Sequence, residues 1–260
     1  MLEVRPYTAA ISMHWLDVTL PSIEENLALD EALLMQAEQG EGGPVLRLWE
    51  VTRASVVVGM NGKVAEEVWL DACRRDGVPI GRRCSGGGSV VLAPGCLVFS
   101  LVLPMSGTNP LEVRGSMQAI LRCLAEQLRG YELDIQLASS SDLVWQQRKV
   151  SGNSQRRLRR YFLHHGTLLY GFDVELAERY LPMPSRVPEY RRGRSHRDFL
   201  TNLPLQRSQL VACLRQAFAA SDAPWYRSDH MGPPLQDGLM TLAQRLVREK
   251  YSRWEWLTRR

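Results

Sequence analysis

The most chemically unusual segment of this sequence is Arg82-Arg83-Cys84-Ser85-Gly86-Gly87-Gly88-Ser89. Consecutive glycines weaken a strand, because each loses much backbone entropy on folding and offers no side chain to pack. They are typical of a place where a ligand lies against the backbone, and the two arginines suit a carboxylate or a phosphate on that ligand. The segment matches neither the P-loop nor the dinucleotide fingerprint. On the glycines alone, a turn without function explains it equally well, and Cys84 is more typical of a small core residue than of a reactive thiol.

A second segment places a lysine on a predicted strand. Asp142 opens an apolar run, a Gln-Gln turn follows, and Lys149 then precedes Val150-Ser151-Gly152-Asn153. This pattern predicts a β-hairpin. An ammonium there could donate to a phosphate or a carbonyl oxygen as a compact charge. Taken alone, the pattern also fits a lysine in solvent.

The following strand carries two adjacent histidines, His164 and His165, before Gly166 and Thr167. Neighbouring side chains of a strand point to opposite faces, so these two histidines cannot ligate one metal ion in regular geometry. We expect one of them to be buried and hydrogen-bonded. The sequence identifies no metal ligands.

Hydrophobic periodicity and turn signals predict the elements that position these segments. Ser22 and Glu25 form a capping box that starts a helix. The predicted helices cover 22–39, 65–76, 111–129, 208–219 and 238–250, and the predicted strands cover 45–51, 54–59, 78–83, 89–91, 97–103, 142–151 and 161–170. The Pro- and Arg-rich stretch 182–197 predicts an ordered loop. Strands interleaved with helices indicate an α+β fold.

Length and composition indicate an ordinary globular protein. The chain has 260 residues, 45% of them hydrophobic, and a formal charge of +4. We expect one catalytic domain over 1–220 and a short helical extension of the same domain over 221–260, with the only plausible boundary at 221–235. Neither a secretory signal nor a membrane-spanning run is recognisable. The five scattered cysteines include no C-x-x-C pair, which predicts a reduced, cytoplasmic protein without disulfides or structural zinc.

Together, these segments resemble the catalytic domain of the lipoate-protein ligases. The resemblance covers residues 26 to 170 and consists of five motifs in the family's order. They are Asn26-Leu27-Ala28-Leu29-Asp30-Glu31, the run Arg82 to Gly88, Ser141-Asp142-Leu143, Lys149-Val150-Ser151-Gly152, and His165 to Leu169. Each motif is weak alone, but their joint order is specific.

The resemblance implies the biotin/lipoate protein ligase catalytic fold, with mixed and antiparallel β-sheets packed against helices. It also implies that ATP and Mg²⁺ activate lipoate or octanoate as an acyl-adenylate, which passes to the ε-amine of a lysine on an acceptor lipoyl domain. Gly86–Gly88 would line the acyl-adenylate pocket, Arg83 would lie near the ligand, and Lys149 would contact the mixed anhydride. Asp142 would order the site or accept the proton of the incoming amine. The other implied substrate-binding residues are Ser85, Ser89, Ser151, Gly152, His165, Gly166 and Thr167.

The sequence departs from the family pattern in three ways. Leu92-Ala93 stands where the two-domain ligases carry His-Asp, so the way in which a metal ion and phosphates would bind at that edge is left open. Cys96 replaces a common Asn. Little chain follows residue 205, so we expect the accessory C-terminal domain to be absent. A separate accessory subunit is therefore a candidate partner.

Octanoyl- and lipoyl-transferases share this fold and are the alternative reading. They use a cysteine thiol that lies before the lysine strand or some distance after it. Here Ser139-Ser140-Ser141 precede Asp142, and no cysteine occurs between Cys123 and Cys213. The thiol route therefore lacks its nucleophile at both places. The Gly-Arg-Gly-Arg type of loop of biotin ligases is not matched.

Two arginine clusters surround the lysine and histidine strands. They are Arg156, Arg157, Arg159 and Arg160, and then Tyr190-Arg191-Arg192-Gly193-Arg194-Ser195-His196-Arg197. They fit a surface for an acidic acceptor domain, contacts with ATP phosphates or a solvated basic face. Polyanion binding through counterion release is also open. A non-catalytic relative that binds acyl-adenylate or nucleic acid is thus a further alternative, although nucleic acid is the least favoured partner.

Overall fold

The computed structural model describes residues 13–105, 112–218, 220–221 and 233–259, and its main feature is a large mixed sheet. The strand order is β11 (Ala220–Ser221), β1 (Met13–Asp17), β2 (Val45–Trp49), β6 (Cys96–Pro104), β10 (Tyr161–Leu169), β9 (Arg148–Arg157), β8 (Asp142–Trp145) and β7 (Ile135–Ala138). The pairs β11–β1 and β1–β2 are parallel, whereas the strands from β2 to β7 pair antiparallel. The predicted mixed α+β architecture is confirmed.

A smaller sheet lies beside the large one. It consists of β4 (Ile80–Arg82), β3 (Ser55–Val58) and β5 (Val90–Leu92), with β3 central. The β3–β4 pair is parallel and the β3–β5 pair is antiparallel. The glycine-rich segment connects β4 to β5, so it leaves the small sheet at one strand and returns at another.

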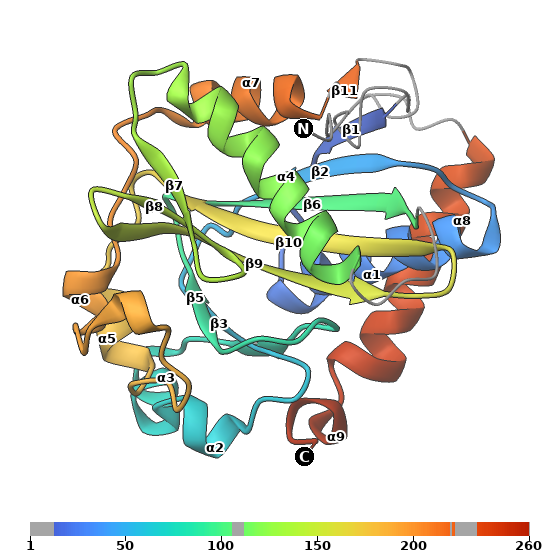
Figure 1. The fold of residues 1–260 in the computed structure, drawn as a ribbon. Coiled ribbons are helices and arrows are strands. Elements are labelled where there is room, and N and C mark those ends of the chain that lie inside the picture. The colour runs from blue at the N-terminus through green and yellow to red at the C-terminus, as the bar shows by residue number, and fades with distance from the viewer. Residues whose placement is uncertain (1–12, 106–111, 219, 222–232, 260) are drawn as a thin grey trace.

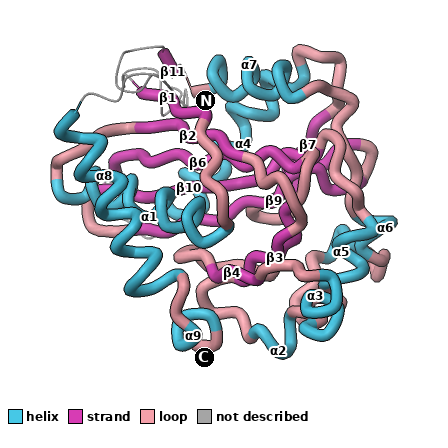
Figure 2. The backbone as a smooth tube through the Cα atoms, turned by 180° about the vertical axis from the view of Figure 1, so that it is seen from behind, coloured by secondary structure: helices cyan, strands magenta, loops and turns pink. Residues whose placement is uncertain are grey.

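Helices cover both faces of the large sheet (Figures 1 and 2). Helices α4 (Glu112–Arg129) and α7 (Arg207–Ala217) lie on one face, and α1 (Ile23–Gln39) and α8 (Pro233–Leu246) lie on the other. Helix α4 follows its predicted periodicity, because Ile120, Leu121, Leu124 and Leu128 are buried in one core cluster with the inner strands.

Helix α1 carries polar residues into the core as well as apolar ones. Its predicted capping box between Ser22 and Glu25 is present, and Gly40 ends the helix in the left-handed conformation. Asp30 is 1% exposed and pairs with the buried Arg47 of β2 at 2.6 Å. A buried carboxylate of this kind needs such a partner, because its desolvation is otherwise too costly.

Several short elements complete the described chain. They are α2 (Val64–Glu67), α3 (Leu70–Asp76), α5 (Glu175–Tyr180), a 3₁₀ turn (Glu189–Arg191), α6 (His196–Phe199), a π-helical turn (Val247–Tyr251) and α9 (Trp254–Leu257). The single helix predicted over 65–76 is wrong. Val68 is extended at φ −138° and buries its side chain in the core, which ends α2 before α3 begins.

Some other boundaries also differ from the prediction. Strand β9 continues to Arg157, and β1 and β7 were not predicted as strands. The stretch 182–197 is mostly loop, as predicted, but contains the 3₁₀ turn and the start of α6. Much of the expected boundary at 221–235 lies outside the described residues. None of the described helices combines the length and apolar character needed to cross a membrane.

Candidate functional site

Two adjoining cavities open where the small sheet meets β9 and β10 of the large one. The inner cavity has a volume of about 160 Å³ and the outer one about 610 Å³. Residues shared by both linings include Gly88, Asp142, Lys149 and Thr167. A ligand bound in the inner cavity would therefore meet the lysine and glycine segments at the junction with the outer one.

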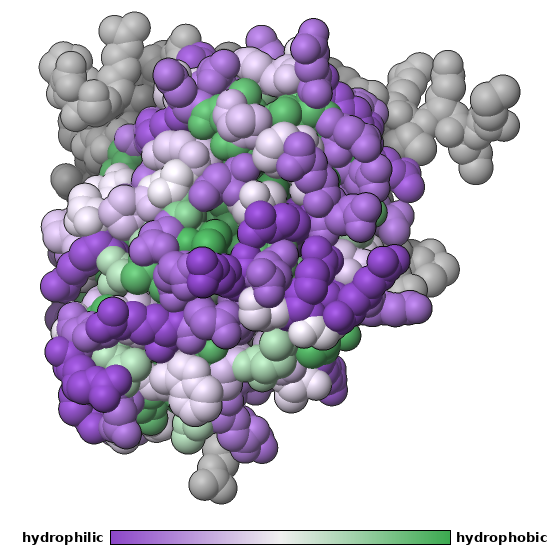
Figure 3. Space-filling view, turned by 90° about the vertical axis from the view of Figure 1, so that its left-hand side faces the viewer, coloured by the Kyte–Doolittle hydropathy of each residue, from purple (hydrophilic) through white to green (hydrophobic). Residues whose placement is uncertain are grey.

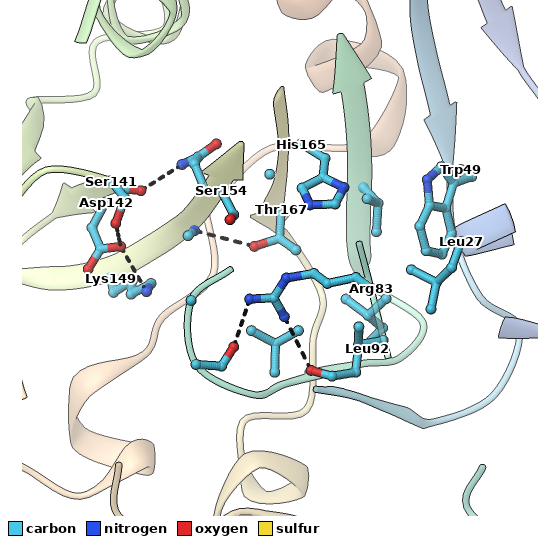
Figure 4. Close-up of a pocket in the computed structure, with 18 residues that line it drawn as sticks. Leu27, Trp49, Arg83, Leu92, Ser141, Asp142, Lys149, Ser154, His165 and Thr167 are labelled. Atoms are coloured by element: carbon cyan, nitrogen blue, oxygen red, sulfur yellow. Dashed lines mark hydrogen bonds and ion pairs between the residues drawn. The ribbon is translucent and has the colours of Figure 1, made fainter. Parts of the chain in front are cut away.

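The inner cavity has an apolar wall and a polar wall. Its apolar side chains are Leu27, Trp49, Val57, Val90, Leu92 and Val98. In Figure 4, Trp49 and Leu27 lie at one end of the site, and the Lys149–Asp142 pair lies at the opposite end. This gradient suits a ligand with an apolar chain and a polar head group, because apolar contacts hold the chain while a few polar groups orient it.

The lysine hairpin presents an ion pair to the cavities. Lys149 Nζ lies 2.9 Å from Asp142 Oδ1, and the lysine side chain is 25% exposed. The predicted turn at Gln146 and Gln147 has positive φ at both residues, as a type I′ hairpin turn requires. A Cβ atom at Gly152 would lie 2.8 Å from Lys149 Nζ. The glycine therefore leaves room for the ammonium to lie across the strand.

Tyr190 belongs to this site and was not identified as a functional residue from the sequence. Its hydroxyl donates to Asp142 Oδ2 at 2.7 Å, so both carboxylate oxygens of Asp142 have a partner. Burial, and then the charge of Asp142, raise the pKa of the Tyr190 hydroxyl. The sequence offered no signal for this contact beyond an aromatic residue inside a basic loop.

Arg83 holds the glycine-rich loop in shape. Its guanidinium donates to the carbonyl oxygens of Gly86 and Gly88 and to Ser85 Oγ. No carboxylate of the described residues forms an ion pair with it, and burial lowers its pKa to about 10. It therefore stays a cation beside the cavity, which favours an anionic ligand group.

A left-handed backbone conformation explains one of the three glycines. Gly87 has φ +88°, a conformation that favours glycine. Its carbonyl oxygen would lie 1.9 Å from a Cβ atom at position 59, where the chain also has a glycine. The far end of the loop is fixed by Glu67, which accepts hydrogen bonds from the backbone and the hydroxyl of Ser89.

A buried polar chain connects this loop to helix α1. His165 Nε2 lies 2.5 Å from Ser85 Oγ, and His165 Nδ1 lies 3.8 Å from Asp30 Oδ2. Arg83 only donates, so Ser85 accepts from it and keeps its own hydroxyl proton available for His165 Nε2. Burial raises the pKa of Asp30, but Arg47 and His165 outweigh this and hold it below its ordinary value.

His164 faces the other side of β10, as the strand alternation predicted. It stacks on Phe99 and lies within hydrogen-bond distance of Asn153 and Gln155. Burial, and then His165, lower its pKa to about 3, so it is neutral at ordinary pH. Both histidines are buried in the structure.

The structure brings most of the predicted site residues to the two cavities. The inner lining contains Arg83, Gly87, Gly88, Asp142, Lys149, Gly152, His165, Gly166 and Thr167, and the outer lining adds Ser89 and Ser151. Ser85 and Gly86 line neither cavity. Ser85 contacts the site through Arg83 and His165, and Gly86 through its carbonyl oxygen.

The cysteines near the site are poor nucleophiles. Burial raises the pKa of the Cys84 thiol to about 12. Cys96 lines the outer cavity but is 1% exposed, and burial raises the pKa of its thiol strongly. Both therefore stay protonated. Within the described ranges, no three His, Cys, Asp or Glu side chains are grouped to hold a metal ion. Mg²⁺ commonly needs fewer protein ligands than that, one or two carboxylates together with substrate phosphates.

Comparisons with known proteins identify relatives of this site and fold. Residues 22–219 match the family model of the lipoyl protein ligase A/B catalytic domain. The octanoyltransferase LipM of Carboxydothermus hydrogenoformans is 31% identical over 90% of this chain and 94% of its own length. A bi-partite lipoate protein ligase from Thermoplasma acidophilum superposes with a TM-score of 0.80 at 23% identity, covering 95% of this chain and 96% of that one. A lipoate-protein ligase A structure with bound ATP gives 0.79 at 22%, covering 95% and 99%.

These matches agree with the geometry on two points. The family model spans the glycine-rich loop, the lysine hairpin and the histidine strand, and the solved ligases share the arrangement of sheets that brings them together. The relatives include both ligases and an octanoyltransferase. The comparisons therefore identify the family but do not identify the acyl donor. The chain belongs to the family of lipoyl protein ligase A/B catalytic domains.

Proposed function

We propose that this protein is a lipoate-protein ligase. It activates lipoate or octanoate with ATP as an acyl-adenylate and transfers the acyl group to a lysine ε-amine on an acceptor lipoyl domain. The observation that carries this proposal is that two cations, Lys149 and Arg83, line the inner cavity together with its apolar wall, and that this lining contains no thiol. The related ligases with bound ATP or with a lipoyl domain support the same substrates.

In the first half-reaction, a carboxylate oxygen of the acid attacks the α-phosphorus of ATP and pyrophosphate leaves. The apolar wall holds the acyl chain, and the charge of Arg83, which forms no ion pair within the described residues, favours the anionic groups that converge there. Bound Mg²⁺ would neutralise phosphate charge in this step. Glu66 and Glu67 line the outer cavity and offer carboxylates on that side, although Glu67 already binds Ser89.

In the second half-reaction, the acceptor amine attacks the acyl carbon. The new C–N bond forms, the bond from the acyl carbon to the AMP oxygen breaks, and the amine proton passes to the departing AMP phosphate or to water. Lys149 donates to the carbonyl oxygen and to the departing phosphate, where charge develops. Asp142 pairs with the Lys149 ammonium and accepts a hydrogen bond from the Tyr190 hydroxyl. Because both of its oxygens have partners, we assign it the role of positioning the ammonium rather than that of accepting the amine proton.

An octanoyltransferase is the second candidate, because the LipM relative covers nearly the whole chain. That route would take the acyl group from a carrier thioester through an enzyme thiol. The two routes differ in acyl donor. The test is the intact mass of an unmodified E2 lipoyl domain after incubation with this protein, ATP, Mg²⁺ and lipoate, beside a reaction with an octanoylated acyl carrier protein.

We expect modification that needs ATP and free acid and that survives replacement of Cys84, Cys96 and Cys123 by serine. Strict dependence on the acyl carrier thioester, with loss of activity on replacing one cysteine, would instead establish the transferase. We further propose that a separate subunit assists activation, and the existence of a bi-partite relative supports this. Preformed lipoyl-adenylate should then react faster than lipoate with ATP, and equal rates without added protein would refute this.

A further inference from the structure

The mouth of the outer cavity carries exposed apolar side chains. Five large apolar side chains of the described residues are exposed, and two of them, Met183 and Val187, lie at this mouth. Met183 and Val187 line the cavity. A third, Trp69, lies next to the end of α5 that leads into this segment, because its backbone N–H donates to the Tyr180 carbonyl oxygen at 2.9 Å. Clustering of such residues on a surface is typical of a protein-binding site.

Free positive charge accompanies these apolar side chains. Arg186 is exposed and lines the outer cavity, and Arg192 is exposed a few residues further on. In the described part of the chain, neither side chain has an ion-pair or hydrogen-bond partner. We define the rim patch as Trp69, Met183, Arg186 and Val187. Figure 3 faces the side of the molecule that carries α5 and α6 and shows apolar areas between strongly hydrophilic side chains.

The neighbouring arginines are already used within the fold. Arg194 donates to the carbonyl oxygens of Gln147 and Tyr190, and Arg148 donates to that of Arg197. The guanidinium of Arg191 lies over the Phe199 ring. These residues fasten the arginine-rich loop to the lysine hairpin. They leave a few free cations next to apolar side chains, a composition that fits a compact acidic protein better than a nucleic-acid backbone.

The rim patch also lies on the route to the reacting atoms. The outer cavity is lined by Met183, Arg186 and Val187 at its mouth and by Asp142 and Lys149 at its junction with the inner cavity. A lysine side chain carried on a protruding turn of another protein can approach Lys149 along this cavity. The body of that protein then rests against the mouth.

We infer that the rim patch is the docking surface for the acceptor domain, a folded domain whose target lysine is flanked by acidic and apolar residues. The inference rests on the proposed function for the chemistry at Lys149. Docking itself is a binding event, so it can be measured without catalysis.

The test compares two rim variants with two matched controls. Trp69→Ser removes the exposed indole and places a favourable N-cap residue before α3, so folding is preserved. Arg186→Glu reverses the free charge. The controls are Trp254→Ser, which removes an indole that is 70% exposed on α9, and Arg122→Glu, which reverses an exposed charge on α4.

The first measurement is the Kd of an unmodified E2 lipoyl domain by titration calorimetry. The second is acyl hydroxamate formation from lipoate and ATP, with hydroxylamine as a small substitute for the acceptor amine. We expect each rim variant to weaken domain binding about tenfold or more, as for central interface residues. The Arg186→Glu effect should be larger at low ionic strength. Hydroxamate formation by Trp69→Ser, whose side chain lines neither cavity, should stay within about twofold of wild type, and both controls should bind normally.

Wild-type binding by both rim variants would overturn the inference. So would variants that bind the lipoyl domain normally but lose binding to an octanoylated acyl carrier protein, because the patch would then serve the acyl donor. A wild-type protein that binds the domain through the patch but forms no hydroxamate supports the docking surface and refutes the proposed activation chemistry. The two failures are therefore distinguishable.

Discussion

Replacing Lys149 by alanine removes an ammonium that lies at the junction of the two cavities. In the proposed transfer step this ammonium donates to the carbonyl oxygen and to the leaving phosphate. Loss of one preorganised donor of this kind lowers rates about 10²–10³-fold, or roughly 3–4 kcal/mol of barrier. We therefore expect that fall in the single-turnover rate from preformed lipoyl-adenylate, with a smaller change in its KM.

The same substitution should have a modest effect on folding stability. Asp142 is 4% exposed and loses its Lys149 partner at 2.9 Å, but it retains the Tyr190 hydroxyl. A buried polar group that loses a partner costs about 1–3 kcal/mol. Because Lys149 is partly exposed, water can enter its place, and we expect the lower end of that range. Adding Asp142→Asn should recover stability without recovering the rate.

Lys149→Arg should also fail to transfer, although it preserves the charge. The ammonium lies so close to Gly152 that a Cβ atom there would be 2.8 Å away. A planar guanidinium is wider and cannot occupy this space without displacing the strand. The assay is intact mass of the lipoyl domain under single turnover, with urea unfolding as the stability measurement. A folded Lys149→Ala protein that transfers at the wild-type rate would refute the assignment of this residue.

Three further substitutions test the surroundings of the ammonium and the core. Gly152→Ala should displace the Lys149 ammonium and slow transfer on the order of 10²-fold. Its control, Gly115→Ala in α4, places the new Cβ atom in open space and should leave the transfer rate unchanged. Tyr190→Phe should lower kcat about tenfold without raising KM, whereas Tyr180→Phe, whose hydroxyl binds a carboxylate outside the cavity linings, should preserve kcat. His164 has its pKa lowered to about 3, so below about pH 6.5 the unfolded chain binds a proton that the folded one does not. The free energy of unfolding should therefore decrease as the pH is lowered below about 6.5, by up to about 1.4 kcal/mol per pH unit. Urea unfolding at pH 7 and pH 5 should show a smaller loss of stability for His164→Gln than for the wild type.

The parts of the fold that the sequence predicted are those set by local patterns. Helix α1 begins at its capping box, and helix α4 follows the spacing of its leucines. The break between α2 and α3 was missed because burying Val68 against the core outweighs local helix propensity. Short strands such as β1 and β7 carry little pattern of their own and depend on their neighbours in the sheet.

The candidate site shows the same division between local and tertiary information. The glycine, lysine and histidine segments were recognisable because each motif is contiguous in the chain. Tyr190 reaches Asp142 across 48 residues of sequence, and its contact exists only once the loop folds over the hairpin. The chain from Asp30 through His165 to Ser85 likewise joins three motifs, and no single motif predicts which of these side chains reaches a cavity.

The choice between adenylate and thioester chemistry depends on which nucleophiles the site can activate. Ser139, Ser140 and Ser141 line the outer cavity, at one of the two places where the family resemblance would put a transferase cysteine. A serine hydroxyl needs an adjacent base, and no described histidine hydrogen-bonds to these three. Ser141 donates weakly to Asp142 Oδ1, at 3.4 Å, but that oxygen already receives Lys149. Direct attack by an amine on an acyl-adenylate needs no enzyme nucleophile, only stabilisation of the developing charge, and an ammonium at this position can provide that.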